Sequence, residues 1–190
     1  MGSRHGLLQA SFIPPRPIRE VRELTRYRKT LVQERADEVN RLQKVLEMAN
    51  VKLGAVATNV VGKRGRDMLT AIIGEQHDPE VLAELARGRL RAKLPQLRQA
   101  LEGRVEAYHR FLLERLLAHI DFLEQSIALV QQEIQERLQP YEEAEGLLLS
   151  IPSLQEAAIA TIISEIGVDM QRFPSDKHLA RLHSCLPRQS

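Results

Sequence analysis

The most regular pattern of apolar residues in the chain lies between residues 105 and 138. Apolar side chains recur there at steps of three or four, with polar residues between them and neither Gly nor Pro: Val105, Tyr108, Leu112, Leu116, Ile120, Leu123, Ile127, Val130, Ile134 and Leu138. This period is typical of an α-helix with one apolar face. At about 1.5 Å per residue the helix extends on the order of 50 Å, and a helix of this kind needs a partner to cover that face.

A second long helix, predicted over residues 18–50, is the nearest available partner. It follows an extended segment, residues 11–17, in which three prolines exclude a helix interior. Its apolar face consists of Val32, Ala36, Val39, Leu42, Leu46 and Ala49. Packing of this helix against residues 105–138 gives an antiparallel hairpin of coiled-coil type, and a partner chain is the alternative or additional cover.

Short helices are predicted at the turn of this hairpin. They cover residues 68–73, 81–87 and 90–101. Asp78 followed by Pro79 is a favourable start for the second, and Pro95 is expected to break or kink the third. Glycines at 62 and 65 predict that residues 62–66 form a flexible basic loop, which lacks the glycine spacing of a phosphate-binding P-loop.

After Pro140 the sequence predicts a small segment that resembles a helix-hairpin-helix. Helices over 141–150 and 154–166 flank the turn Ile151-Pro152-Ser153, and Gly167 is expected to cap the second helix. A plain helical hairpin without DNA contact is the alternative interpretation. The turn that contacts DNA phosphate normally needs glycine, whereas Ser153 and Gln155 occupy the turn here.

The predicted fold class is therefore all-α: a long antiparallel coiled-coil helical hairpin followed by a small helix-hairpin-helix-like segment. The expected organisation is an extended lead-in (1–17), the hairpin with short helices at its turn (18–139) and the start of a further domain (140–190). Composition agrees, since aromatic residues make up only 4% and Trp is absent. The single cysteine excludes an internal disulfide and favours an intracellular protein, and no long apolar run predicts a membrane span.

The net charge of +2 hides an asymmetry along the chain. Residues 1–65 hold 13 Lys and Arg against 6 Asp and Glu, so the first third is basic. Such a segment suggests an anionic partner, nucleic acid before membrane. The candidate nucleic-acid-binding residues are Arg16, Arg19, Arg22, Arg26, Arg28, Lys29, Lys63, Arg64 and Arg66. The alternative is a solvated helix face paired locally with Glu20 and Glu23.

Candidate chemistry is otherwise sparse. His178, His183 and Cys185 lie close in sequence but are too few for a metal site without distant partners, and the sequence offers no second cysteine. The aspartates and glutamates form no cluster that suggests a two-metal site. The sequence therefore predicts no metal, no cofactor and no catalytic residue in this chain.

Three segments resemble a known family. They are the run Phe12 to Glu20, the run Leu24 to Lys29, and the C-terminal run Ser164 to Ala180. They resemble the DEDD insertion-sequence transposases, bacterial recombinases with a RuvC-like domain, a long coiled-coil hairpin and a C-terminal serine transposase domain. The resemblance extends from about His5 to Ala180, with the helical middle similar mainly in pattern.

The resemblance implies a role in DNA transposition and recombination. It implies DNA as partner, a structured guide RNA in several members, Mg²⁺ in the RuvC-like domain, and a bacterial, nucleoid-associated cytoplasmic location. The first three acidic residues of the family have no counterpart here, the fourth matches no residue, and Ser184 to Ser190 departs from the pattern around the family's serine. We therefore expect a truncated, catalytically inactive part of such an enzyme, contributing nucleic-acid contact and self-association through the coiled coil. A non-enzymatic helical adaptor or structural protein is the alternative.

Overall fold

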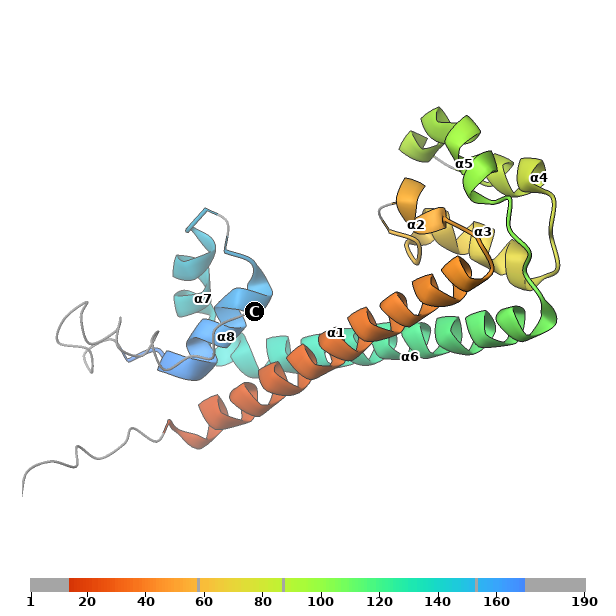
Figure 1. Ribbon diagram of the computed structural model, residues 1–190. Coiled ribbons are helices and arrows are strands. Elements are labelled where there is room, and N and C mark those ends of the chain that lie inside the picture. Colours follow the sequence, from red (N-terminus) through yellow and green to blue (C-terminus); the bar gives the residue numbers. More distant parts are fainter. Residues whose placement is uncertain (1–13, 58, 87, 153, 170–190) are drawn as a thin grey trace, which may run out of the picture. The chain divides into compact units, whose positions relative to one another are not determined.

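The structure, a computed structural model, describes residues 14–57, 59–86, 88–152 and 154–169. Over these residues it is helical, with no β-strand, which confirms the predicted all-α class (Figure 1). The elements in chain order are α1 (Arg16–Met48), α2 (Leu53–Val56), α3 (Lys63–Ile73), α4 (Pro79–Glu84), the 3₁₀ turn η1 (Gly88–Lys93), α5 (Leu94–Ala100), α6 (Ala107–Leu138), the 3₁₀ turn η2 (Gln139–Tyr141), α7 (Glu142–Leu149) and α8 (Glu156–Ile166).

The described chain forms two compact units. The central unit is Thr30–Ala128, and the terminal unit combines the chain up to Lys29 with the chain from Leu129 onward. This division differs from the three consecutive segments expected from the sequence, because the first residues of α1 pack with α6, α7 and α8 rather than with their sequence neighbours. The described part excludes most of the predicted lead-in (residues 1–13), Ser153 of the predicted turn, and residues 170–190. His178, His183 and Cys185 fall in this last range.

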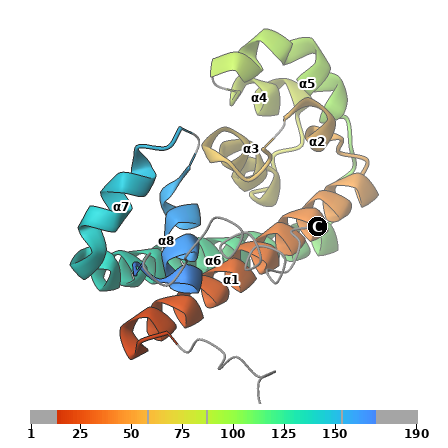
Figure 2. The same ribbon diagram turned by 90° about the vertical axis from the view of Figure 1, so that its left-hand side faces the viewer.

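In the central unit, α1 and α6 run antiparallel and share a core with the short helices. Leu42 and Leu46 of α1 are buried with Leu113 and Ile120 of α6. The order of the polar contacts shows the direction: Arg35 Nε donates to Glu124 at 2.9 Å, whereas Glu38, further along α1, lies 3.4 Å from His119, which is earlier in α6. The short helices form the rest of this unit: α4 lies beside α5, and both α2 and α3 contribute residues to the same core (Figures 1 and 2).

The terminal unit has a second, smaller core. Ile18 and Val21 of α1 are buried with Ile134 and Leu138 of α6 and with the α8 residues Ile159, Ala160 and Ile163. Arg137 of α6 donates to Glu20 of α1 at 2.8 Å, so the start of α1 lies against the end of α6. Helices α7 and α8 contact each other, as expected of a helical hairpin (Figure 2).

The apolar faces of the two long helices differ from the prediction in the first turns of α6 and around the middle of α1. Tyr108 and Leu112 are 51% and 38% exposed, while His109 and Leu113 are buried in their place. In α1, Val32 is 42% exposed, and Leu31 and Glu38 are buried instead. Steps of three and four fit both sets of residues, so the period alone does not select the face; packing against the short helices does. From Ile120 to Leu138, the predicted positions are buried or half-buried.

The flexible loop predicted at residues 62–66 is wrong, because α3 begins at Lys63 rather than at Met68. Gly65 lies in its first turn, where a Cβ atom would come 1.9 Å from the carbonyl oxygen of Val60. The glycine is therefore required by a close approach of two backbone segments and not by flexibility. This contact turns a sequence that looks like a loop into the start of a helix.

The predicted helix caps fare better. The Asp78 carboxylate accepts a hydrogen bond from the Glu80 N–H at 2.9 Å, and Pro79 opens α4. Gly167, with φ of 73°, ends α8, and its N–H donates to Ile163 at 2.8 Å. The helix predicted over 90–101 is divided at Pro95, as expected: the 3₁₀ turn η1 ends at Lys93, and α5 begins at Leu94 with Pro95 in its first turn, where a backbone N–H needs no partner.

Candidate nucleic-acid interface on α1

Five of the six candidate basic residues in the first half of α1 lie on one side of the helix, but in different environments. Arg16, Arg19, Arg26 and Lys29 are exposed, and the side chains of Arg16 and Arg26 are 83% and 62% accessible. Exposed guanidinium and ammonium groups at helical spacing can contact successive phosphates. We call these four residues the basic face.

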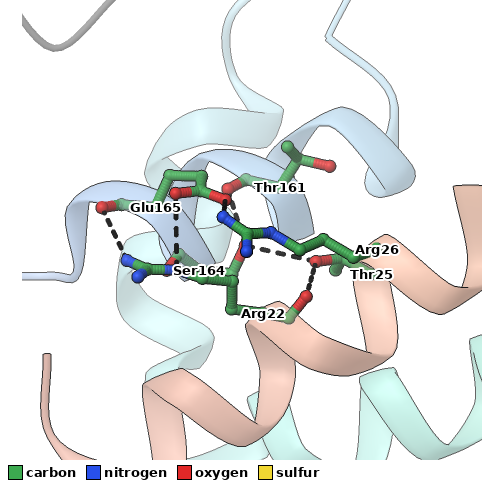
Figure 3. A network of polar contacts seen from close by, with 6 residues as sticks. All are labelled: Arg22, Thr25, Arg26, Thr161, Ser164 and Glu165. Carbon is green, nitrogen blue, oxygen red and sulfur yellow. Dashed lines mark hydrogen bonds and ion pairs between the residues drawn. The ribbon is translucent and has the colours of Figure 1, made fainter. Parts of the chain in front are cut away.

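Arg22 lies within the same row but is used by the fold. Its side chain is only 20% exposed. The guanidinium donates to the carbonyl oxygens of Ser164 and Glu165 at 3.0 and 3.2 Å, and it lies 3.3 Å from the Glu165 carboxylate (Figure 3). The last carbonyls of a helix have no partner within it, so this cation caps the C-terminus of α8 and offsets its partial negative charge. Arg22 is therefore a structural residue of the terminal unit.

Hydroxyl groups complete the contact between α1 and α8. Ser164 is fully buried, and its hydroxyl donates to the Thr161 carbonyl at 2.8 Å. The Thr25 hydroxyl donates to the Arg22 carbonyl at 2.9 Å and lies 3.4 Å from the Ser164 hydroxyl (Figure 3). Each buried hydroxyl thus has a partner, which fixes α8 against this turn of α1. Periodicity in the sequence gave no signal for this network, because its members are far apart along the chain.

Acidic neighbours moderate the basic face without covering it. Arg26 lies 3.3 Å from Glu165, and Arg16 lies 2.9 Å from Glu20, which also contacts Arg137. Glu23 is exposed on the same side of α1. Exposed ion pairs of this kind are weak, at about 0–1 kcal/mol, and a phosphate can displace them. The net charge of the face stays positive.

Arg28 does not belong to this face. It lies on the other side of α1, is half-buried, and has an Nε atom without a hydrogen-bond partner among the described residues. A half-buried guanidinium of this kind is poorly placed to reach a phosphate backbone. Of the six candidates in α1, the structure therefore leaves four on the exposed surface.

The second candidate patch, Lys63, Arg64 and Arg66, begins α3 in the central unit. The side chains of Lys63 and Arg64 lie outside the described part of the structure. Arg66 is 26% exposed: its guanidinium donates to the Val61 carbonyl at 2.7 Å and contacts Asp121 and, at 2.8 Å, Glu124 of α6. Arg66 therefore joins α3 to α6, and its guanidinium is less accessible to a phosphate than that of a residue in a flexible loop.

The described residues offer little other chemistry. Among them, no three His, Cys, Asp or Glu side chains lie close enough to hold a metal ion. A cavity of about 300 Å³ in the terminal unit is lined by Gln and Glu side chains, an environment that repels phosphate. None of the helices between Pro14 and Asp169 is both long and apolar enough to cross a membrane.

Comparison of the chain with known protein families, with curated proteins and with solved structures found no match. The arrangement of side chains is therefore the ground for the functional conclusion.

Proposed function

We propose that this chain contributes nucleic-acid contact and self-association to an insertion-sequence transposase. The proposal joins the resemblance of its N- and C-terminal runs to that family with one structural observation. The observation is that Arg16, Arg19, Arg26 and Lys29 are exposed together on α1, while Arg22 holds the helix in place. A rigid helix that presents cations at intervals of one or two turns suits a phosphate backbone.

The partners in this proposal are DNA and, for several members of the family, a structured guide RNA, in the bacterial cytoplasm. Contacts between these cations and phosphates do not depend on the identity of the bases, so binding should depend on salt more than on sequence. No catalytic residue is assigned to the chain, and Mg²⁺ belongs to the RuvC-like domain of the family. The long helices α1 and α6 provide the surface for self-association.

A salt titration of duplex DNA and structured RNA binding tests the proposal. The variant R19E/K29E reverses two exposed charges of the basic face without touching the Arg22 cap. The control K44E/K52E makes the same change in net charge at two exposed lysines of the central unit. We expect R19E/K29E to weaken binding more than about tenfold and to lower the slope of log K against log salt by about 2, with a much smaller effect of the control.

Two results would reject the proposal. Absence of binding to both ligands at low salt would favour a helical adaptor or structural protein whose charges only keep it hydrated. Equal loss of affinity in R19E/K29E and K44E/K52E would mean that net charge, and not the basic face, is responsible. Arg22 is left unchanged in both variants, because its loss would disturb α8.

A further inference from the structure

A row of apolar side chains is exposed on α6 in the central unit. Tyr108, Phe111 and Phe122 are 51%, 62% and 61% exposed, and Leu112 is 38% exposed. Ala118 is also exposed and lies between them. We call these five residues the aromatic face. The apolar period of residues 105–138 does not indicate this face, because it places Tyr108 and Leu112 in the core.

This face is distinct from the one that α6 buries in its own chain. Leu113 and Ile120, which are fully buried, lie on the opposite side of the helix at 100° per residue. Helix α6 therefore has two apolar faces, and the described part of the chain covers one of them. A helix that is apolar on two sides is normally packed on both.

The charges around the aromatic face argue against nucleic acid as its occupant. Of the acidic residues on this stretch of α6, Glu114 is exposed at the edge of the aromatic face, whereas Asp121 and Glu124 contact Arg66 of α3. Arg115, the cation within the row, lies 2.7 Å from Glu114, which offsets its charge. A stacking platform for single-stranded nucleic acid combines aromatic rings with a positively charged groove, and that positive groove is missing from this stretch of α6.

The order of residues instead suits a second copy of the chain. Phe111 and Phe122 are eleven residues apart, which is three helical turns, so they lie on the same side of α6. If two copies of α6 pack antiparallel about a two-fold axis between Arg115 and Ala118, Phe111 of each copy lies against Phe122 of the other. The same register sets Glu114 against the partner's His119 and the small Ala118 against the partner's Arg115. It also places Tyr108 opposite the partner's Gln125 and Leu112 opposite the partner's Asp121, so the two Phe–Phe contacts are the apolar centre of the pairing.

The exposed area is sufficient for such a dimer. Tyr108, Phe111, Leu112 and Phe122 each present roughly 100 Å² of side chain at these exposures, or about 800 Å² for two copies. The polar residues of the row bring the total above about 1,000 Å², the lower bound for a specific interface.

We propose that the aromatic face of α6 is a self-association surface, through which two copies pack antiparallel with Phe111 of each against Phe122 of the other. This inference deepens the proposed self-association and is independent of the contact with nucleic acid. The two proposals fail separately, since one is read from oligomeric state without nucleic acid and the other from nucleic-acid binding.

Analytical ultracentrifugation of the full chain and of two single variants, F111E and F122K, tests the proposal. We expect a monomer–dimer equilibrium for the unchanged chain. Each variant alone should raise the dimer Kd at least about 100-fold, because both copies carry the change. An equimolar mixture should recover the dimer, since antiparallel packing sets Glu at 111 against Lys at 122 and keeps one Phe–Phe contact. The control L147E changes a side chain that is 74% exposed on α7, in the terminal unit, and should leave the Kd within twofold.

Circular dichroism shows whether each variant folds, and the exposed positions make loss of the fold unexpected. The proposal is overturned if the unchanged chain is monomeric at about 100 μM, if F111E and F122K dimerise like L147E, or if their mixture stays as weak as either variant alone. Binding of the chain to single-stranded RNA that F111E abolishes, without any dimer, would instead assign this face to base stacking.

Discussion

Replacement of Arg22 by Ala should release α8 from α1 while leaving the central unit intact. The guanidinium makes two hydrogen bonds to carbonyls at the C-terminus of α8, at 3.0 and 3.2 Å, and an ion pair with Glu165 at 3.3 Å. A hydrogen bond to a charged group contributes about 1.5–3 kcal/mol. The bonds share one side chain that is 20% exposed, and the freed carbonyls reach water in the variant, so we expect a loss of about 2–3 kcal/mol rather than their sum.

Hydrogen exchange read by mass spectrometry measures this loss locally. A destabilisation of about 2–3 kcal/mol raises the population of open α8 about 30- to 150-fold, and the exchange rate of amides in Glu156–Ile166 rises with it. Amides of α4 and α5, which lie in the central unit, should exchange as before. Arg22→Lys keeps the charge but loses the fork of donors, so an intermediate acceleration is expected.

Two neighbouring arginines are the matched controls. Arg19→Ala removes an exposed side chain and should change α8 exchange less than about twofold. Arg26→Ala removes an ion pair to Glu165 from a side chain that is 62% exposed, and a change of no more than about fivefold is expected. If Arg22→Ala accelerated α8 exchange no more than Arg19→Ala does, the conclusion that Arg22 caps α8 would be wrong.

Three further substitutions test single contacts. Gly65→Ala should destabilise the central unit by about 1–3 kcal/mol in urea unfolding, although Ala favours helices, because its Cβ would meet the Val60 carbonyl; stabilisation would refute that close approach. Asp78→Ala should cost about 1 kcal/mol by loss of the bond from the Glu80 N–H, with Asp78→Asn nearly neutral, and equal losses in both would exclude the capping role. Arg66→Met should lower the free energy of unfolding by about 1–3 kcal/mol in the same assay. An unchanged free energy would mean that the contacts of Arg66 with α6 do not stabilise the unit.

Local signals in the sequence were sufficient for the helices and several of their ends. A period of three to four gave both long helices, Asp78-Pro79 gave the start of α4, and Gly167 gave the end of α8. These features depend on residues close together along the chain, so one sequence contains all the information that they need.

The tertiary structure decided which side of each helix is covered and which charges are available. Near residue 110 of α6, two sets of side chains satisfy the helical period, and only packing against α1 and the short helices selects Leu113 over Leu112. Arg19 and Arg22 are equivalent in the sequence, yet Arg22 meets the end of a helix that begins more than 130 residues later. The charge and spacing of a side chain indicate which kinds of group it can bind. Which group it does bind is decided by long-range contacts, which no local sequence pattern encodes.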